Sequence, residues 1–467
     1  MLQPHPAPAS SVETTDVRSL TRRGRLARFL LAAQMVARIY GGYKLIQAYG
    51  RLISQSGLAE RYARHHRRSA ELIYSTATCL EGLLIKACQF IGSRADILPP
   101  QYIDGLSRLH DRVPPKPFSV IQKQVEREIG RPLSEVFSFF CPTPIASASL
   151  AQVHEARLKD GQRVAVKVQY PDIAAIIDLD LRNFTFFINL LTRLERSFDL
   201  RIILREVRKY VPLELDFVHE GQTAERIARN FATRDDVLIP RIYWEYTTRK
   251  VLVMEYMDGI KITDVDALEA AGIDTRAVAQ KLTEVYCQQV LIDGIFHADP
   301  HPGNLLVQPG PRIVFLDFGL AKDLPPEFPA EMAKLTVAIL VQDTAAIVES
   351  FKRLGFVTRN GGSESLLTLG EAMLGHAVKE NKAYADPEMV ERFNYEVSQA
   401  LRNDPIVEAP SDLVLVGRVM GLLSGLGKQL GSEVNLFTTL LPFLSNHESP
   451  LRQKNPDGVT ATGPSRR

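Results

Sequence analysis

Two acidic motifs in the chain have a spacing that suits chemistry on metal-bound phosphates. The first is HADPHPGN at 297–304, and the second is LDFG at 316–319. Asp299 precedes Asn304 by five positions, which is the separation of Asp and Asn in the pattern HRDxxxxN. This spacing, followed by a second acidic motif, predicts a phosphoryl-transfer site.

Each polar residue of these motifs has a distinct expected role. Carboxylate and amide oxygens are the hard ligands that Mg²⁺ prefers, so Asp317 and Asn304 are candidate metal ligands. Asp317 would bind the metal that bridges the terminal phosphates, and Asn304 would bind a second metal. Asp299 would accept or orient the proton of the attacking hydroxyl. The alternative is that Asp299 and Asn304 are ordinary turn residues among the neighbouring Pro and Gly.

A short hairpin is expected between the two motifs. The apolar runs 305–307 and 313–316 flank the turn Gln-Pro-Gly-Pro at 308–311. Because a hairpin brings its two ends together, Asn304 and Asp317 are predicted to meet on magnesium.

A nucleotide lysine is predicted upstream, on a strand at 163–168. Alternation places valines on one face and Ala165 with Lys167 on the other. In a nucleotide site the small Ala165 would let an adenine ring approach, while Lys167 would reach the α- and β-phosphates. The alternative for Lys167 is a lysine on an edge strand.

Two further segments complete the predicted nucleotide site. The strand at 250–254 leads into a turn. The backbone of this turn, at Glu255 and Met257, is expected to hydrogen-bond a purine edge. The alternative is a strand that simply leaves the sheet. The sequence lacks a GxGxxG motif before Lys167 and has an Ala- and Ser-rich run there instead. Ala and Ser restrict the backbone freedom that Gly would provide, although Ser hydroxyls still donate to phosphate. The candidate nucleotide contacts in this run are Ala146, Ser147, Ala148, Ser149 and Val153.

Composition excludes several classes of protein. The 467 residues are 45% apolar, which indicates a globular protein, and the net charge of +2 argues against a nucleic-acid-binding polycation. The four cysteines form no CxxC, which argues against a zinc site or a disulfide framework. The sequence shows neither a secretory signal nor an apolar run long enough to span a bilayer.

The chain is expected to contain six successive segments. Residues 1–17 and 448–467 are predicted to be disordered. Residues 18–70, rich in Lys and Arg, are predicted to form a basic amphipathic helical segment that lies on an anionic membrane surface or docks on its own domain. The rest is expected to comprise helices at 71–135, a mixed lobe at 136–258 and a helical lobe at 259–447. This order of elements predicts an α+β, bilobal protein-kinase-like fold.

Four blocks together resemble the UbiB/AarF atypical kinase-like proteins, which are linked to coenzyme Q and other prenyl-lipid metabolism. The resemblance covers roughly residues 83–322. The blocks are KACQ with FIGSRADILPPQYIDGLSRLHDRVPP, PIASASLAQVH with VAVKVQYP, ELDF at 214–217, and HADPHPGNLLV with LDFG.

The resemblance implies further roles for specific residues. It makes Lys167 the nucleotide lysine and Glu220 its helix partner. It implies a KxGQ helical segment that packs over the active site, where Lys86 pairs with Glu214. Gln89 belongs to the same motif, and Asp216 is the Asp of an ExD motif; the alternative is that these charges are solvated. Cys88 departs from the family pattern, which usually has Gly at this position.

The leading hypothesis is an ATP- and Mg²⁺-dependent kinase-like ATPase acting in prenyl-lipid, ubiquinone-type metabolism. The alternatives are a nucleotide-gated lipid-binding scaffold with little catalysis and a small-molecule phosphotransferase. The expected partners are a prenyl lipid or quinone precursor, a membrane surface bound peripherally, and lipid-biosynthesis enzymes, but no nucleic acid. The resemblance implies a cytoplasmic or peripheral inner-membrane location in a bacterium and a mitochondrial or plastid location in a eukaryote.

Overall fold

The computed structural model describes residues 20–50, 55–92, 100–106, 115–195, 201–371, 404, 406–408, 410–432, 434 and 436–444. The segments predicted to be disordered, 1–17 and 448–467, lie outside the described residues. No helix within the described ranges combines the length and apolar character needed to cross a membrane.

The chain divides into two compact units. Unit 1 comprises Met1–Arg229, Ile239–Asp258 and Leu316–Leu320, and unit 2 comprises Asn230–Leu238, Gly259–Phe315 and Ala321–Arg467. Each unit therefore includes segments that are distant in sequence. In particular, Asp317 belongs to unit 1, whereas Asp299 and Asn304 belong to unit 2.

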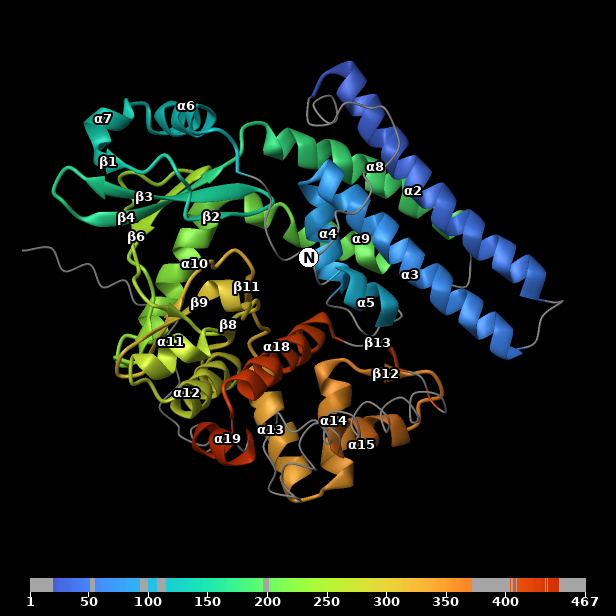
Figure 1. Ribbon diagram of the computed structural model, residues 1–467. Coiled ribbons are helices and arrows are strands. Elements are labelled where there is room, and N and C mark those ends of the chain that lie inside the picture. Colours follow the sequence, from blue (N-terminus) through green and yellow to red (C-terminus); the bar gives the residue numbers. More distant parts are fainter. Residues whose placement is uncertain are drawn as a thin grey trace, which may run out of the picture. The chain divides into compact units, whose positions relative to one another are not determined.

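Unit 1 contains an antiparallel sheet with the strand order β1-β3-β4-β6, and β2 pairs with β3 (Figure 1). Its strands are β1 (Phe137–Phe140), β2 (Ala146–Ser147), β3 (Ala151–Leu158), β4 (Arg163–Gln169) and β6 (Val251–Glu255). The strands predicted at 163–168 and 250–254 are thus confirmed. In register, Lys167 of β4 lies opposite Val153 of β3 and Leu252 of β6.

The alternation of side chains along β4 separates a core face from a functional face. Val164, Val166 and Val168 are fully buried and belong to the hydrophobic core that includes Ile121 and Val125 of α6 (Phe118–Ile129). Period-2 alternation places Ala165 and Lys167 on the opposite face. Burial of the three valines fixes the register, because a one-residue slip would place Lys167 in the core.

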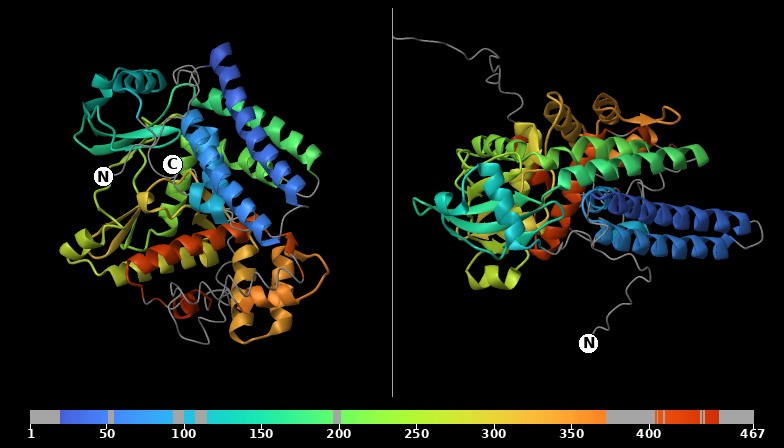
Figure 2. Two further views of the ribbon diagram at one scale, coloured as in Figure 1. Left: turned by 45° about the vertical axis from the view of Figure 1, so that its right-hand side comes forward. Right: turned by 90° about the horizontal axis from the view of Figure 1, so that it is seen from above.

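The helices of unit 1 surround this sheet and extend away from it. They are α2 (Arg22–Tyr49), α3 (Gln55–Leu80), α4 (Leu83–Gly92), α5 (Pro100–Leu106), α6, α7 (Leu133–Val136), α8 (Ile173–Leu194), α9 (Arg201–Tyr210) and α10 (Phe217–Asn230). Helix α2 runs alongside both α3 and α8 (Figure 2).

The chain between Arg201 and Asn230 does not form one continuous helix. Helix α9 ends at Tyr210, a short 3₁₀ turn η3 (Leu213–Leu215) follows Pro212, and α10 begins at Phe217. Proline has no backbone N–H and clashes with the preceding turn, so it ends the helix here. Glu214 and Glu220 therefore do not lie on one continuous helix.

Helix α2 also differs from the predicted basic amphipathic helix. Leu26 and Leu30 are exposed, whereas Arg28 is only 1% exposed. Arg28 donates from Nε to Asp180 Oδ1 of α8 at 2.8 Å, and its second contact to this carboxylate completes a buried ion pair. Thus α2 docks on its own unit through a face that includes a buried arginine, and part of its apolar surface remains exposed.

Unit 2 combines small sheets with helices. Its strands are β5 (Val237–Leu238), β7 (Ile260–Lys261), β8 (Ile295–His297), β9 (Leu305–Gln308), β10 (Arg312–Phe315), β11 (Ala321–Asp323), β12 (Val357–Thr358) and β13 (Ile406–Glu408). Its helical elements are α11 (Val265–Ala270), α12 (Thr275–Gln288), the π-helix η4 (Gln289–Asp293), the 3₁₀ turn η5 (Pro302–Asn304), α13 (Phe328–Leu340), α14 (Thr344–Leu354), α15 (Glu364–Gly370), α18 (Ser411–Gln429) and α19 (Leu436–Leu444).

The predicted hairpin is confirmed as β9 and β10. These strands pair antiparallel from Leu305 opposite Phe315 to Gln308 opposite Arg312. Strand β10 also pairs with β5, and β9 with β7, which gives the order β5-β10-β9-β7. The hairpin is anchored by Leu305, Val307, Ile313 and Val314, which are fully buried.

Candidate functional site

The centre of the candidate site in unit 1 is the ammonium group of Lys167. Its Nζ lies 2.7 Å from Glu220 Oε1 and 3.2 Å from Asp317 Oδ1. These residues come from β4, from the first turn of α10 and from the segment 316–320. The structure therefore brings together three residues that the sequence assigned to one nucleotide site, although 150 positions separate Lys167 from Asp317.

The three charges change one another's ionisation. Burial alone would lower the pKa of Lys167, but the carboxylates of Asp317 and Glu220 outweigh it and raise the pKa above its usual value. Burial disfavours the ionised form of Asp317, yet the ammonium groups of Lys167 and Lys86 hold its pKa well below its usual range. Asp317 is consequently a carboxylate at neutral pH, as a metal ligand must be.

Glu220 shows the opposite shift. Its burial raises the pKa of the carboxyl, Lys167 opposes this effect and the negative charge of Asp317 adds to it, so that the pKa is about 7. The charge on Glu220 therefore depends on pH within the physiological range.

The backbone around Asp317 is unusual. Asp317 has a φ of 56°, a left-handed conformation that few non-glycine residues adopt. Its Oδ1 accepts a hydrogen bond from the backbone N–H of Gly319 at 3.3 Å. A Cβ atom at position 319 would lie 3.4 Å from that oxygen and 3.8 Å from Glu220 Oε2, so Gly319 lies beside both carboxylates. Such backbone outliers concentrate at functional sites.

Asp216 positions the helix that carries Glu220. Its Oδ1 accepts hydrogen bonds from the backbone N–H groups of Val218 and His219 at 3.1 and 3.3 Å, so it caps the N-terminus of α10. Its Oδ2 pairs with Arg249. The resemblance places Asp216 only in the covering motif, although an Asp before a helical run is also a typical N-cap signal.

The structure also brings together Lys86 and Glu214, the expected pair of the covering segment. Lys86 of α4 forms an ion pair with Glu214 of η3, and burial raises the pKa of Glu214 despite Lys86. The side chain of Gln89 lies outside the described residues. Cys88 is buried in a small hydrophobic cluster with Ala77 and Leu106, so its sulfur fills space between α3, α4 and α5.

The Ala- and Ser-rich loop lies at the tip of the hairpin formed by β2 and β3. The N–H of Ala148 donates to the carbonyl of Ala151 at 2.8 Å, and is thus used within the loop. Ser147 Oγ is 2.8 Å from the hydroxyl of Tyr170. The hydroxyl of Ser149 is buried and has no hydrogen-bond partner within the part of the chain that the structure describes. A buried hydroxyl without a partner fits the binding of a phosphate oxygen here, whereas Ala146 and Ala148 are exposed.

The predicted adenine contacts include residues of the functional face of the sheet and the segment that follows β6. Ala165 is opposite Met254 in register, and Val153 is opposite Lys167. The N–H of Glu255 donates to the carbonyl of Arg241 at 2.8 Å, so the carbonyl of Glu255 is the backbone group that the predicted contact to a purine edge would use. Sequence pattern missed this bond because Arg241 lies outside the predicted strands. Met257 lies beyond β6, in the segment that leads to β7, and remains a candidate contact.

In unit 2, the structure brings Asp299 and Asn304 together. Asn304 Nδ2 donates to Asp299 Oδ2 at 3.2 Å and to the carbonyl of Asp299 at 3.3 Å. The turn η5 is capped by His301, whose Nδ1 accepts from the N–H of Gly303. The loop follows β8 and the π-helix η4, a rare element found frequently at functional sites. The amide oxygen of Asn304 in unit 2 and the carboxylate of Asp317 in unit 1 are each the kind of oxygen ligand that Mg²⁺ prefers, and their meeting on magnesium stays a prediction.

Comparison with known proteins identifies the family. The family model of the ABC1 atypical kinase-like domain matches residues 108–351. The chain is 32% identical over 418 residues to an uncharacterized protein of Synechocystis, covering 88% of this chain and 72% of that protein. It is also 32% identical to AarF domain-containing protein kinase 1 of Xenopus tropicalis, covering 79% of this chain and 72% of the relative.

Two further similarities are more limited in what they show. The chain is 37% identical to the protein ACTIVITY OF BC1 COMPLEX KINASE 8, chloroplastic, of Arabidopsis thaliana. The match covers 59% of this chain and 37% of that protein. The structure of Rv3197 with erythromycin from Mycobacterium tuberculosis matches with a TM-score of 0.60 at 24% identity, covering 82% of this chain and 97% of that one, and shows the fold alone. The α+β kinase-like fold, the matched domain and these relatives together show that the chain belongs to the ABC1/AarF (UbiB) atypical kinase-like family.

Proposed function

We propose that this protein is an ATP- and Mg²⁺-dependent kinase-like ATPase that acts in prenyl-lipid, ubiquinone-type metabolism. The observation that carries the proposal is the contact of Lys167 with both Glu220 and Asp317 in unit 1. A lysine held by a helix glutamate and placed beside an ionised aspartate is the arrangement that kinase chemistry requires.

Each residue has a specific task in this proposal. Lys167 holds the α- and β-phosphates, and Glu220 orients its ammonium group. Asp317 and Asn304 supply oxygen ligands to Mg²⁺, which when bound neutralises charge on the transferred phosphate. Asp299 orients the attacking hydroxyl or water and holds its proton at the carboxylate. The loop 146–149 contacts phosphate through the hydroxyl of Ser149.

The position of Lys86 supports a substrate other than a protein. Lys86 is close enough to contribute to the lowered pKa of Asp317, and its ion pair with Glu214 holds α4 beside the charged cluster. This segment would occupy space that an extended peptide needs. The phosphoryl acceptor in the proposal is therefore water or a small lipid-linked molecule.

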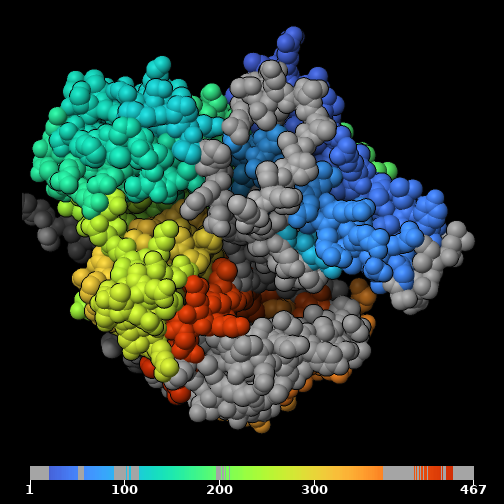
Figure 3. All heavy atoms as spheres, in the orientation of Figure 1, coloured from blue at the N-terminus to red at the C-terminus, as the bar shows by residue number. Residues whose placement is uncertain are grey.

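Exposed apolar side chains on α2 and α8 support peripheral binding to a membrane. Leu26 and Leu30 on α2 and Phe186 on α8 are 58%, 55% and 52% exposed. Helices α2 and α3 both reach the surface of unit 1, coloured blue in Figure 3. The basic residues Arg22, Arg23 and Arg25 at the start of α2 are also exposed and would favour anionic lipids.

Such a surface would give the active site access to a prenyl lipid or quinone precursor and to lipid-biosynthesis enzymes. The proposed location is the cytoplasm or the inner-membrane surface of a bacterium, or a mitochondrion or plastid of a eukaryote. The chloroplastic relative is compatible with the last of these.

The test is phosphate release from Mg²⁺-ATP by purified protein, with and without liposomes that contain a prenyl quinone precursor. We expect release that the liposomes stimulate and that Asp317→Asn abolishes. Nucleotide binding without release in either condition would refute the ATPase and favour a nucleotide-gated lipid-binding scaffold. Release coupled only to a soluble acceptor would instead indicate a small-molecule phosphotransferase.

A further inference from the structure

An apolar cavity of about 170 Å³ lies within unit 1 between α2, α4 and α8. Its walls include Met35 and Val36 of α2, Leu84 and Ala87 of α4, and Phe187 and Leu191 of α8. An apolar cavity of about 150 Å³ in a protein stays dry and binds a small hydrocarbon such as benzene. A cavity of this size and lining is therefore suited to part of a hydrocarbon chain.

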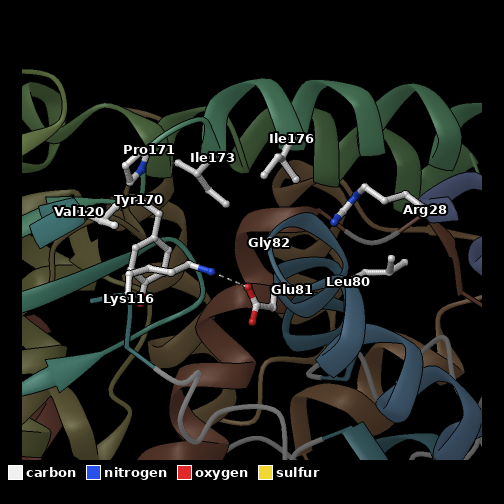
Figure 4. Close-up of a pocket in the computed structure, with 10 residues that line it drawn as sticks. All are labelled: Arg28, Leu80, Glu81, Gly82, Lys116, Val120, Tyr170, Pro171, Ile173 and Ile176. Carbon is white, nitrogen blue, oxygen red and sulfur yellow. Dashed lines mark hydrogen bonds and ion pairs between the residues drawn. The ribbon is translucent and has the colours of Figure 1, made fainter. Parts of the chain in front are cut away.

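A second, more polar cavity of about 130 Å³ adjoins the first. Arg28 and Leu80 line both cavities. Figure 4 shows the second cavity, with Ile173 and Ile176 on one side, Lys116 and Tyr170 at one end, and Arg28 at the other. The apolar cavity and the more polar one thus lie on either side of Arg28 and Leu80.

The charges around this space are balanced in pairs. Arg28 is paired with Asp180, and Lys116 Nζ lies 3.4 Å from Glu81 Oε2. A charged ligand group would lose hydration without finding an excess of opposite charge, which is costly in a partly buried site. An uncharged group that accepts or donates hydrogen bonds avoids this cost.

The buried ion pair itself is unusual for a packing contact. Arg28 is 1% exposed and sits against apolar side chains of α4 and α8. Replacing such a pair by apolar residues is often neutral or stabilising, so stability gives little reason for it. The ion pair of Arg28 and Asp180 lies where the two cavities adjoin. It therefore provides polar groups at the point where the head group of an amphiphile would begin.

The polar cavity is connected to the loop of the proposed nucleotide site. The hydroxyl of Tyr170 is 2.8 Å from Ser147 Oγ, and the ammonium group of Lys116 lies 5.5 Å from the centre of the Tyr170 ring. The backbone N–H of Lys116 also donates to Gln152 Oε1 on β3 at 2.8 Å. A ligand that contacts Lys116 and Tyr170 therefore acts on residues that hold the loop 146–149.

We propose that the two cavities form one binding site for an amphiphile with a single hydrocarbon chain and an uncharged polar head group, and that its occupancy changes nucleotide affinity through Tyr170 and Ser147. The hydrocarbon lies between α2, α4 and α8, and the head group contacts Arg28 and Lys116. The change in nucleotide affinity rests on the proposed function, whereas binding of the amphiphile does not.

Binding is tested by equilibrium dialysis of the full chain against tritium-labelled 1-decanol without nucleotide. We expect saturable binding of one molecule per chain, with decanoate about tenfold weaker because its carboxylate is charged. Ala32→Phe, at a partly buried position of α2 that lines the apolar cavity, should weaken decanol binding about tenfold or more. Ala37→Phe, at an exposed position of the same helix, is the matched control and should bind as the wild type does.

Val36→Phe, which also places a ring in the apolar cavity, is the second variant if Ala32→Phe fails to fold. Thermal unfolding shows whether each variant is folded. Non-saturable uptake, or saturable binding that both filled variants retain, would overturn the site. Decanoate binding as tight as that of decanol would overturn the uncharged head group.

The link to the nucleotide site is tested by ATP affinity at saturating decanol. We expect decanol to change the affinity of the wild type about threefold or more. The change should disappear in Tyr170→Phe, which removes the hydroxyl that contacts Ser147; decanol binding is measured in that variant so that saturation is ensured. Decanol binding with no effect on wild-type ATP affinity would refute the link. Complete absence of ATP binding would refute the proposed function and leave the dialysis result as an independent test of the site.

Discussion

Lys86 of α4 forms an ion pair with Glu214, which lies six residues before Glu220, the partner of Lys167. Two lysines from separate elements thus bind two glutamates on either side of the start of α10. Pro212 and the cap at Asp216 make this possible, because they separate the turn that carries Glu214 from the helix that carries Glu220. The covering helix and the nucleotide lysine are therefore connected through one short segment.

Asp317→Asn should abolish Mg²⁺-dependent ATP binding, because an amide at this position is a weaker metal ligand than the carboxylate. Calorimetric titration with ATP, with and without Mg²⁺, measures the effect. Asp160→Asn, in the exposed turn between β3 and β4 of the same unit, is the control and should retain the wild-type response. Mg²⁺-dependent affinity that survives in Asp317→Asn would count against its assignment as a metal ligand.

Lys86→Ala should loosen α4 and raise autophosphorylation, because it leaves the carboxylate of Glu214 without its cation. The loss of stability is expected to be up to about 3 kcal/mol, since one partner of a largely buried ion pair is removed. Limited proteolysis and incorporation of labelled phosphate measure the two effects. Adding Glu214→Gln to this variant should recover part of the stability. Unchanged protease sensitivity and phosphate incorporation in Lys86→Ala would show that the pair does not hold the cover.

The raised pKa of Glu220 predicts a pH-dependent stability difference. The folded protein binds this proton more tightly than the unfolded chain, since the pKa rises from 4.5 to about 7 on folding. The free energy of unfolding contributed by Glu220 is therefore fully present below pH 4.5 and is lost as the pH rises to about 7. Relative to Glu220→Gln, the wild type should lose roughly 1 to 3 kcal/mol over this window.

Urea unfolding followed by tryptophan fluorescence measures this difference. Trp244 is the sole tryptophan of the chain, and its indole N–H donates to Glu225 of α10 at 2.6 Å, so it reports on the helix that carries Glu220. A wild-type stability that stays parallel to that of Glu220→Gln across this pH range would contradict the raised pKa.

Asp216→Ala should destabilise α10 by about 1 kcal/mol, because it removes the N-cap. Asp216→Asn keeps a capping oxygen and loses only the ion pair with Arg249, whose side chain is largely exposed, so it should cost less than about 0.5 kcal/mol. The same fluorescence assay compares the two variants. Equal losses in both would assign the effect of Asp216 to Arg249 and not to the cap.

Leu26→Gln with Leu30→Gln should weaken binding to anionic liposomes, because these exposed side chains would enter the interface. Deletion of residues 18–68 is a poorer test, since it would also remove the buried Arg28. Val357→Gln, at an exposed position of β12 in unit 2, serves as the control in the same sedimentation assay. Undiminished sedimentation of the double variant would exclude this part of α2 as the membrane contact.

The sequence by itself determined the family, the two acidic motifs, the strand of Lys167 and the hairpin of β9 and β10. Each of these depends on short-range spacing or on alternation, which local backbone geometry translates directly into structure. The family resemblance also indicated the partners of Lys86 and Lys167.

Only the tertiary structure decided which charges are buried and what they do there. Arg28 is one of many basic residues in the segment 18–70, yet packing of α2 on α8 pairs it with Asp180, 152 positions away. Asp216 caps α10, and the carbonyl of Arg241 accepts a hydrogen bond from the N–H of Glu255. Both contacts depend on where the neighbouring segments lie in the folded chain. Sequence periodicity records which face of a helix or strand is apolar, whereas the partner of a buried polar group depends on which elements meet in the folded chain.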